Sequence, residues 1–95
     1  MRIVASHPAL PGHFPGHPVV PGVVLLDVVI ESLSRYAGGP VRVLGFPSVK
    51  FLAPLQPEQD FDVTFSNGRS GQAGFEVSRG DTRLVKGTVS FEVAA

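Results

Sequence analysis

The chain has 95 residues, no cysteine, and eight Lys or Arg residues balanced by eight Asp or Glu residues. Its length predicts one domain, 1–95, which would bury only about 60–65% of its unfolded surface and would gain stability from a second chain. The balanced charge argues against nucleic acid or an anionic membrane as the main partner, and the lack of cysteine excludes a disulfide framework, a zinc–thiolate site and a thiol nucleophile.

A short strand is expected at the N-terminus, followed by a segment rich in proline and glycine at residues 8–22. The opening MRIVAS lacks the apolar core of a signal peptide. The longest apolar run, 23–30, is interrupted by Asp27 and is too short to span a bilayer. We therefore expect a soluble, cytoplasmic protein.

A helix is predicted from Pro21 to about Tyr36. Proline is tolerated in the first turn of a helix, and good apolar helix formers follow it. Glu31 and Arg35 are spaced to pair at i,i+4, and the glycines at 38–39 provide a stop.

Strands are predicted over the rest of the chain. Residues 41–52 read as a long strand bent near 45–47, because Pro47 cannot donate a ladder hydrogen bond. Alternating patterns follow at 60–66, 73–78 and 84–93, with turns at 67–68 and 79–82. A single helix must cover the apolar face, so the predicted fold class is α+β, one helix lying across an antiparallel sheet. The side chains expected on that face are Phe61, Val63, Phe65, Ala73, Phe75, Val77, Val85, Val89, Phe91 and Val93.

The predicted helix begins without a capping side chain. Val19 and Val20 precede Pro21, whereas a capped helix usually has Ser, Thr, Asp or Asn there. Gly22 adds a position where a ligand can approach the backbone closely. Such an N-terminus suits a carbonyl oxygen that becomes negative during a reaction, although water could also cap the helix.

Asp27 and His13 are candidate acid and base. Asp27 shares a helical stripe with Glu31 and Arg35, which suggests a solvated face, but the same stripe continues backward into valines. We expect Asp27 at that apolar border, partly buried, where a carboxyl can stay protonated and act as a general acid. Neutral His is the usual general base near pH 7, and five prolines between residues 8 and 21 stiffen the surroundings of His13.

Three other interpretations of His13 remain. It could be an ordinary surface histidine, or part of a polyproline segment around PALP that another protein recognises. It could also join His7 and His17 in a metal site, although their spacing matches no regular element that would converge three ligands.

The stretch HFPGHPVVPGVVLLD resembles the H-F-x-G-x-P-x-x-P-G motif of the hotdog-fold 3-hydroxyacyl-acyl-carrier-protein dehydratases. In that family a catalytic acid follows fourteen residues after the histidine, which is the interval from His13 to Asp27. The resemblance covers about 7–93 and is most specific over 12–27. Two departures stand out: typical members have a longer N-terminal part, and Glu58 stands where a glycine is common.

The resemblance implies a hotdog homodimer, open to further assembly, with active sites shared between the chains. His13 would act as base and Asp27 as acid, and Gly22 and Val23 would hold the substrate oxyanion. Phe14 and Val20 are acyl-pocket candidates. The implied reaction is dehydration of a 3-hydroxyacyl thioester on acyl carrier protein to a trans-2-enoyl thioester, in fatty-acid-like or polyketide-like synthesis, without metal or organic cofactor. A hotdog acyl thioesterase and a non-catalytic acyl-binding module are the alternatives.

Overall fold

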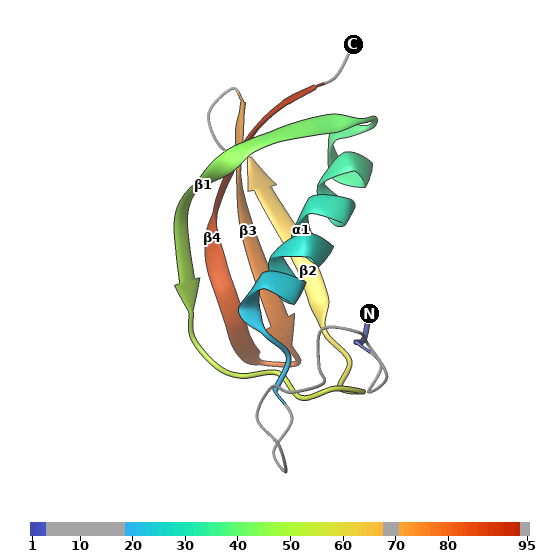
Figure 1. Ribbon diagram of the computed structural model, residues 1–95, viewed down its shortest axis with the longest axis vertical. Helices are drawn as coiled ribbons and strands as arrows, with labels where there is room; N and C mark the ends of the chain where they lie inside the picture. The colour runs from blue at the N-terminus through green and yellow to red at the C-terminus, as the bar shows by residue number, and fades with distance from the viewer. Residues whose placement is uncertain (4–18, 68–70, 94–95) are drawn as a thin grey trace.

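One helix and four strands form the described part of the protein. The computed structural model describes residues 1–3, 19–67 and 71–93. Helix α1 spans Gly22–Ala37, and strands β1 to β4 span Val41–Phe51, Asp62–Asn67, Gln72–Arg79 and Thr82–Val93. The strands pair antiparallel in the order β1-β4-β3-β2, and α1 crosses one face of the curved sheet (Figure 1). The predicted α+β architecture is confirmed.

Both ends of α1 follow from the local sequence. Pro21 is the N-cap residue, with φ −58° and ψ 142°, and no side chain in the described part of the protein caps the helix. At the other end Gly38 adopts φ 81°, a left-handed conformation that glycine reaches without steric cost. The backbone N–H of Gly39 then donates to the Ser34 carbonyl oxygen at 3.0 Å, which satisfies one of the free carbonyls of the last turn.

Strand β1 is bent, as the sequence predicts. Its pairing with β4 shifts register between Val43 and Gly45 and again between Gly45 and Ser48. The second of these irregularities contains the proline at position 47, and bulges of this kind sharpen the local twist and bend of a strand. Because β1 is the first strand in the sheet order, its outer edge has no partner strand among the described residues.

The core lies between α1 and the inner face of the sheet. Most of the predicted inward side chains are buried there, including Phe61, Phe75 and Val77. Val93 is a correction: it was expected to face inward, yet it is 62% exposed because α1 does not extend over the end of β4. Leu84 and Val85 are both buried, which follows from the register shift that the β3–β4 ladder makes beside them, between Val77 and Ser78.

Residues Met1–Ile3 lie against the segment that precedes β2. They belong to none of the assigned strands, so the expected first strand is not found in these three residues, and the positions after them lie outside the described ranges. Their backbone still pairs in strand-like fashion: Phe61 N–H donates to the Met1 carbonyl and Glu58 N–H to the Ile3 carbonyl, each at 2.8 Å. Ile3 is also buried in the core.

Candidate active site

The uncapped N-terminus of α1 opens into a largely apolar pocket of about 440 Å³. The first N–H groups of a helix have no intrahelical acceptor, and here no side-chain oxygen of the described residues replaces one. No acidic side chain lies in the first turn to offset the positive end of the helix dipole. The absence of a cap, inferred from the sequence, is therefore confirmed. The pocket is lined by Val19, Val20, Pro21, Gly22, Leu25, Phe51, Leu52, Ala53, Pro54 and Leu55.

Gly22 is in close contact with the end of β1. A β-carbon built on Gly22 would lie 2.5 Å from Cε1 and 2.7 Å from Cζ of Phe51, far inside normal van der Waals distance. The Phe51 ring can therefore pack onto the helix N-terminus only because residue 22 is glycine. Phe51 remains 56% exposed, so its ring forms a wall of the pocket and is not part of the core.

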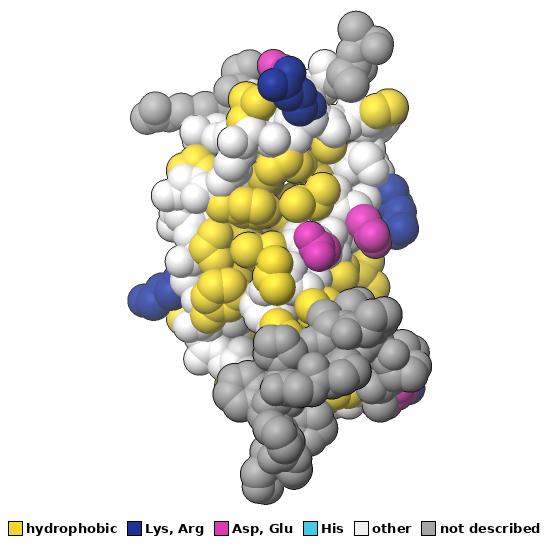
Figure 2. Space-filling model, viewed as in Figure 1, with side chains coloured by type: hydrophobic (Ala, Val, Ile, Leu, Met, Phe, Trp, Pro, Cys, Tyr) yellow, Lys and Arg dark blue, Asp and Glu magenta, His cyan; other side chains and the backbone are white. Residues whose placement is uncertain are grey.

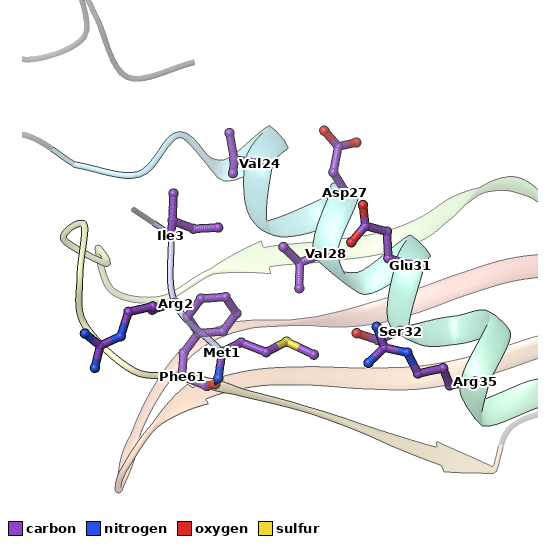
Figure 3. A pocket seen from close by; sticks show the side chains of 10 residues that line it. All are labelled: Met1, Arg2, Ile3, Val24, Asp27, Val28, Glu31, Ser32, Arg35 and Phe61. Carbon is purple, nitrogen blue, oxygen red and sulfur yellow. The ribbon is translucent and has the colours of Figure 1, made fainter. Parts of the chain in front are cut away.

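Asp27 lines a different pocket, of about 460 Å³, between α1 and the N-terminal residues. Figure 3 shows Asp27 and Glu31 projecting from successive turns of α1, above Val28 and Phe61. Asp27 is exposed in the single chain, so the expected partial burial is not found. The reason is helical geometry: Val20 and Val24 turn into the core, whereas Val23 is 64% exposed and Asp27 stays beside it on the outer side.

Two polar residues of the Asp27 pocket, Ser32 and Arg2, differ in whether their polar atoms have partners among the described residues. The Ser32 hydroxyl is buried and has no hydrogen-bond partner in the described part of the chain. Arg2 is well paired: its Nη2 lies 2.8 Å from Asp60 Oδ1 and its Nη1 lies 3.6 Å from Glu58 Oε2. The hydrogen bond to Asp60, followed by the charge of Asp60, raises the pKa of Arg2 above its ordinary value.

Among the residues that the structure describes, the two pockets share no lining residue. Gly22 and Asp27 are five positions apart on α1, which places them about 140° apart around the helix axis at 3.6 residues per turn. Within one chain, Gly22 and Asp27 therefore line different pockets on different sides of the helix. Of the other predicted site residues, Val20 lines the pocket at the helix N-terminus and Val23 projects outward, whereas His13 and Phe14 lie outside the described residues.

The described residues contain neither a cluster of metal-ligating side chains nor a helix able to span a membrane. No group of three or more His, Cys, Asp or Glu side chains there is arranged to hold a metal ion. The set of His7, His13 and His17 lies outside those ranges. Within the same ranges α1 has neither the length nor the apolar character that a membrane-spanning helix requires.

Sequence reasoning missed Phe51 and Ser32 as pocket residues. The contact of Phe51 with Gly22 depends on where β1 ends relative to α1, and no periodic pattern encodes that distance. Ser32 reads as a polar residue on a helix, and only its rotation toward the core shows that its hydroxyl is buried. The helix stripe that links Asp27 to Glu31 did predict one neighbour in the Asp27 pocket.

A solved structure has the same fold. The dehydratase heterocomplex ApeI:P from Xenorhabdus doucetiae matches with a TM-score of 0.82 over 96% of this chain and 81% of the matched chain, at 21% sequence identity. Together with the single helix lying across a curved antiparallel sheet, this match identifies a hotdog-fold protein.

The match to a family model narrows the assignment from the hotdog fold to one family. A family model named ApeI-like, described as ApeI dehydratase, matches residues 1–88, and the chain belongs to this family. Curated relatives named 3-hydroxyacyl-[acyl-carrier-protein] dehydratase FabZ also match. The relative from Thermus thermophilus is 39% identical over 58% of this chain and 38% of its own length. The relative from Herpetosiphon aurantiacus is 26% identical over 97% of this chain and 73% of its own length.

The match to the relatives is partial in most cases. The FabZ relative from Syntrophobacter fumaroxidans, for example, is 29% identical over 59% of this chain and 44% of its own length. The chain thus spans less than half the length of each of three curated relatives, among them those from Syntrophobacter fumaroxidans and Thermus thermophilus.

Proposed function

We propose that this protein dehydrates a 3-hydroxyacyl thioester carried on acyl carrier protein, giving a trans-2-enoyl thioester and water. Membership of the ApeI-like family and the interval from His13 to Asp27 support the reaction class. The structural observation that carries the proposal is the uncapped, glycine-containing N-terminus of α1, which opens into an apolar pocket. This arrangement suits an acyl thioester, whose carbonyl oxygen gains negative charge when the α-proton leaves.

Each group has one role in the proposed mechanism. His13 removes the proton α to the thioester carbonyl as general base. The backbone N–H groups at Gly22 and Val23 hold the enolate oxygen that forms. Asp27 donates a proton to the β-hydroxyl, the bond from the β-carbon to this oxygen breaks, and the departing group is water. Phe14 and Val20 contact the acyl chain. The scheme uses no metal and no organic cofactor.

The proposed active site needs two chains. Because Gly22 and Asp27 line separate pockets of one chain, we infer that Asp27 serves the helix N-terminus and His13 of a partner. The free edge of β1 offers a surface for a second copy, because an unpaired edge strand is a template for strand pairing. Figure 2 shows a band of hydrophobic side chains on the helix-bearing face, with acidic side chains beside it. Exposed Val23 and Phe51 are among the apolar residues that a partner chain would cover.

The direct test is an assay with a 3-hydroxyacyl chain loaded on acyl carrier protein, followed by mass spectrometry of the enoyl product. His13→Ala should lower turnover by at least about 100-fold, since a positioned general base contributes about that much or more. His17→Ala is the matched control in the same segment and should retain turnover. Release of a free carrier thiol without enoyl product would instead identify a thioesterase. Tight acyl binding with neither product would identify a binding module.

A further inference from the structure

Two lysines face each other on the outer surface of the sheet, the surface turned away from α1. Lys50 of β1 and Lys86 of β4 are Cα partners in the ladder, and both side chains are exposed. Neither forms an ion pair with any residue in the described part of the chain. Like charges directly opposite each other on neighbouring strands are destabilising, so this pair lowers the stability of the fold.

Two other cations of the sheet, Arg42 and Arg83, each lie close to a carboxylate. Arg42, on the same face at the opposite end of the β1–β4 ladder, has Glu92 as its Cα partner, and its Nη1 lies 3.3 Å from Glu92 Oε1. Glu76 is the Cα partner of Lys86 on β3, but its Oε1 lies 3.3 Å from Nε of Arg83. Lys50 and Lys86 therefore stay adjacent to each other without a carboxylate partner in the described part of the chain.

This charge lies at the active-site end of the sheet. Lys50 immediately precedes Phe51, the last residue of β1, whose ring packs on Gly22 at the start of α1. The chain then continues through Leu52–Leu55, which line the same pocket. In Figure 1 the arrowhead of β1 and the start of β4 lie at the same end of the sheet as the start of α1. Lys50 is thus adjacent in sequence to the first β1 residue that lines the pocket.

We propose that Lys50 and Lys86 bind the acidic surface of the acyl carrier protein and the phosphate of its pantetheine arm, at the entrance to the pocket. This inference rests on the proposed function, because it assumes a substrate delivered on a carrier. Charge complementarity selects the occupant: two adjacent, uncompensated ammonium groups attract an anionic protein and accelerate its encounter. The pantetheine arm then passes around the end of β1 to the helix N-terminus, and the cost of opposing two lysines is offset when the anionic partner binds.

The test compares carrier-linked and carrier-free substrates. Lys50→Ala and Lys86→Ala should each raise KM for 3-hydroxyacyl-acyl-carrier protein about threefold, and the double variant about tenfold, because exposed charge pairs contribute modestly. Saturated kcat and activity on the N-acetylcysteamine thioester should stay at the wild-type level. The salt dependence of KM should become weaker in the double variant, since fewer charges take part in the encounter.

Two variants serve as controls. Arg42→Ala removes an exposed cation from the same strand and the same face but from the compensated end, and it should leave KM unchanged. Lys50→Arg preserves the charge and should keep the wild-type KM. An equal effect of Arg42→Ala would overturn the assignment, because it would show a general response to net charge.

A binding titration separates this proposal from the proposed function. Holo-acyl carrier protein is titrated into the wild-type chain and the double variant, with no turnover required. Weaker binding by the double variant supports docking at the lysines even if the wild type dehydrates nothing, in which case only the proposed reaction fails. Equal affinity of both proteins for the carrier would overturn the docking site and leave the reaction intact. Wild-type binding to anionic phospholipid vesicles, with none to the carrier, would also overturn it.

Discussion

Glu58 adopts a backbone conformation that residues with a side chain usually avoid. Its φ is 67°, the one positive φ among the described non-glycine residues. The conformation directs its N–H to the Ile3 carbonyl at 2.8 Å and places its carboxylate within 3.6 Å of Arg2. The resembling dehydratases commonly have glycine at this position, and the observed φ provides the physical reason. At Glu58 a strained backbone is thus accompanied by an additional contact, between its carboxylate and Arg2 in the N-terminal residues.

Replacing Glu58 should separate these two effects. Glu58→Gly removes both the strain and the carboxylate, whereas Glu58→Ala removes the carboxylate and keeps the strain. Because a left-handed conformation costs an L-residue about 1 kcal/mol, Glu58→Gly should exceed Glu58→Ala in free energy of unfolding by about that amount. Urea denaturation of the three proteins measures the difference. Equal stability of the two variants would show that residue 58 is not strained in solution.

The residues that sequence could identify are those with a local signature. The missing helix cap was evident from the two valines and Pro21, and the motif interval pointed to Asp27. The exposure of Asp27 was not predictable, because it depends on which of two apolar neighbours, Val23 or Val24, turns toward the sheet. Both fit a helical stripe, and only packing decides between them.

At the level of elements, β1 has two functions in the proposed enzyme. Its end carries Phe51 against the helix N-terminus, and its free edge is the proposed pairing surface. Sequence predicted the strand and its bend, because Pro47 marks the irregularity, but it could not predict that β1 is an edge strand. That property depends on the order β1-β4-β3-β2, which follows from pairing between residues distant in the chain.

Leu44 allows a test of the β1 edge. Leu44 lies near the middle of β1 and is 58% exposed, so Leu44→Lys should leave the folded chain nearly as stable as before, within about 0.5 kcal/mol. A lysine at a strand edge opposes pairing with a second edge, so the variant should dissociate to monomers at concentrations where the wild type is dimeric. Sedimentation velocity measures this shift.

The matched control for the β1 edge is Val93→Lys, which changes an equally exposed valine on β4. Strand β4 lies between β1 and β3 in the sheet order, and Val93 is the Cα partner of Val41, so this position is not on the free edge of β1. A similar loss of dimer in both variants, or a wild type that is monomeric at all concentrations, would contradict the edge-pairing model.

At the level of the whole molecule, the separation of the two pockets is the structural support for the proposed two-chain site. One chain presents a helix N-terminus on one side of α1 and Asp27 on another, and neither pocket contains the other group. The sequence resemblance implied an active site built from His13 of one chain and Asp27 of the other. Composition and periodicity could not imply it, because they carry no information on how two chains meet.

Mixing two inactive variants tests the shared site. His13→Ala and Asp27→Asn are combined under conditions that exchange subunits, and dehydration is measured after re-equilibration. Random pairing makes about half of the dimers mixed, and each mixed dimer holds one site with both groups intact, so activity should return to about a quarter of the wild-type value. Demonstrated exchange without recovered activity would place both groups of a site in one chain.

The strand order has a consequence for how the chain reaches its fold. The β2–β3 and β3–β4 ladders join neighbours in sequence, but the β1–β4 ladder pairs Val41 with Val93 and Phe51 with Val85. These pairs close long stretches of chain, and contacts between distant residues slow folding because closure entropy is lost before the contacts form. We therefore expect the β2–β3–β4 meander to assemble before β1 docks. Until β1 is in place, the edge of β4 has no partner strand and the helix N-terminus lacks Phe51, so a nascent chain exposes an unpaired strand edge that the folded chain covers.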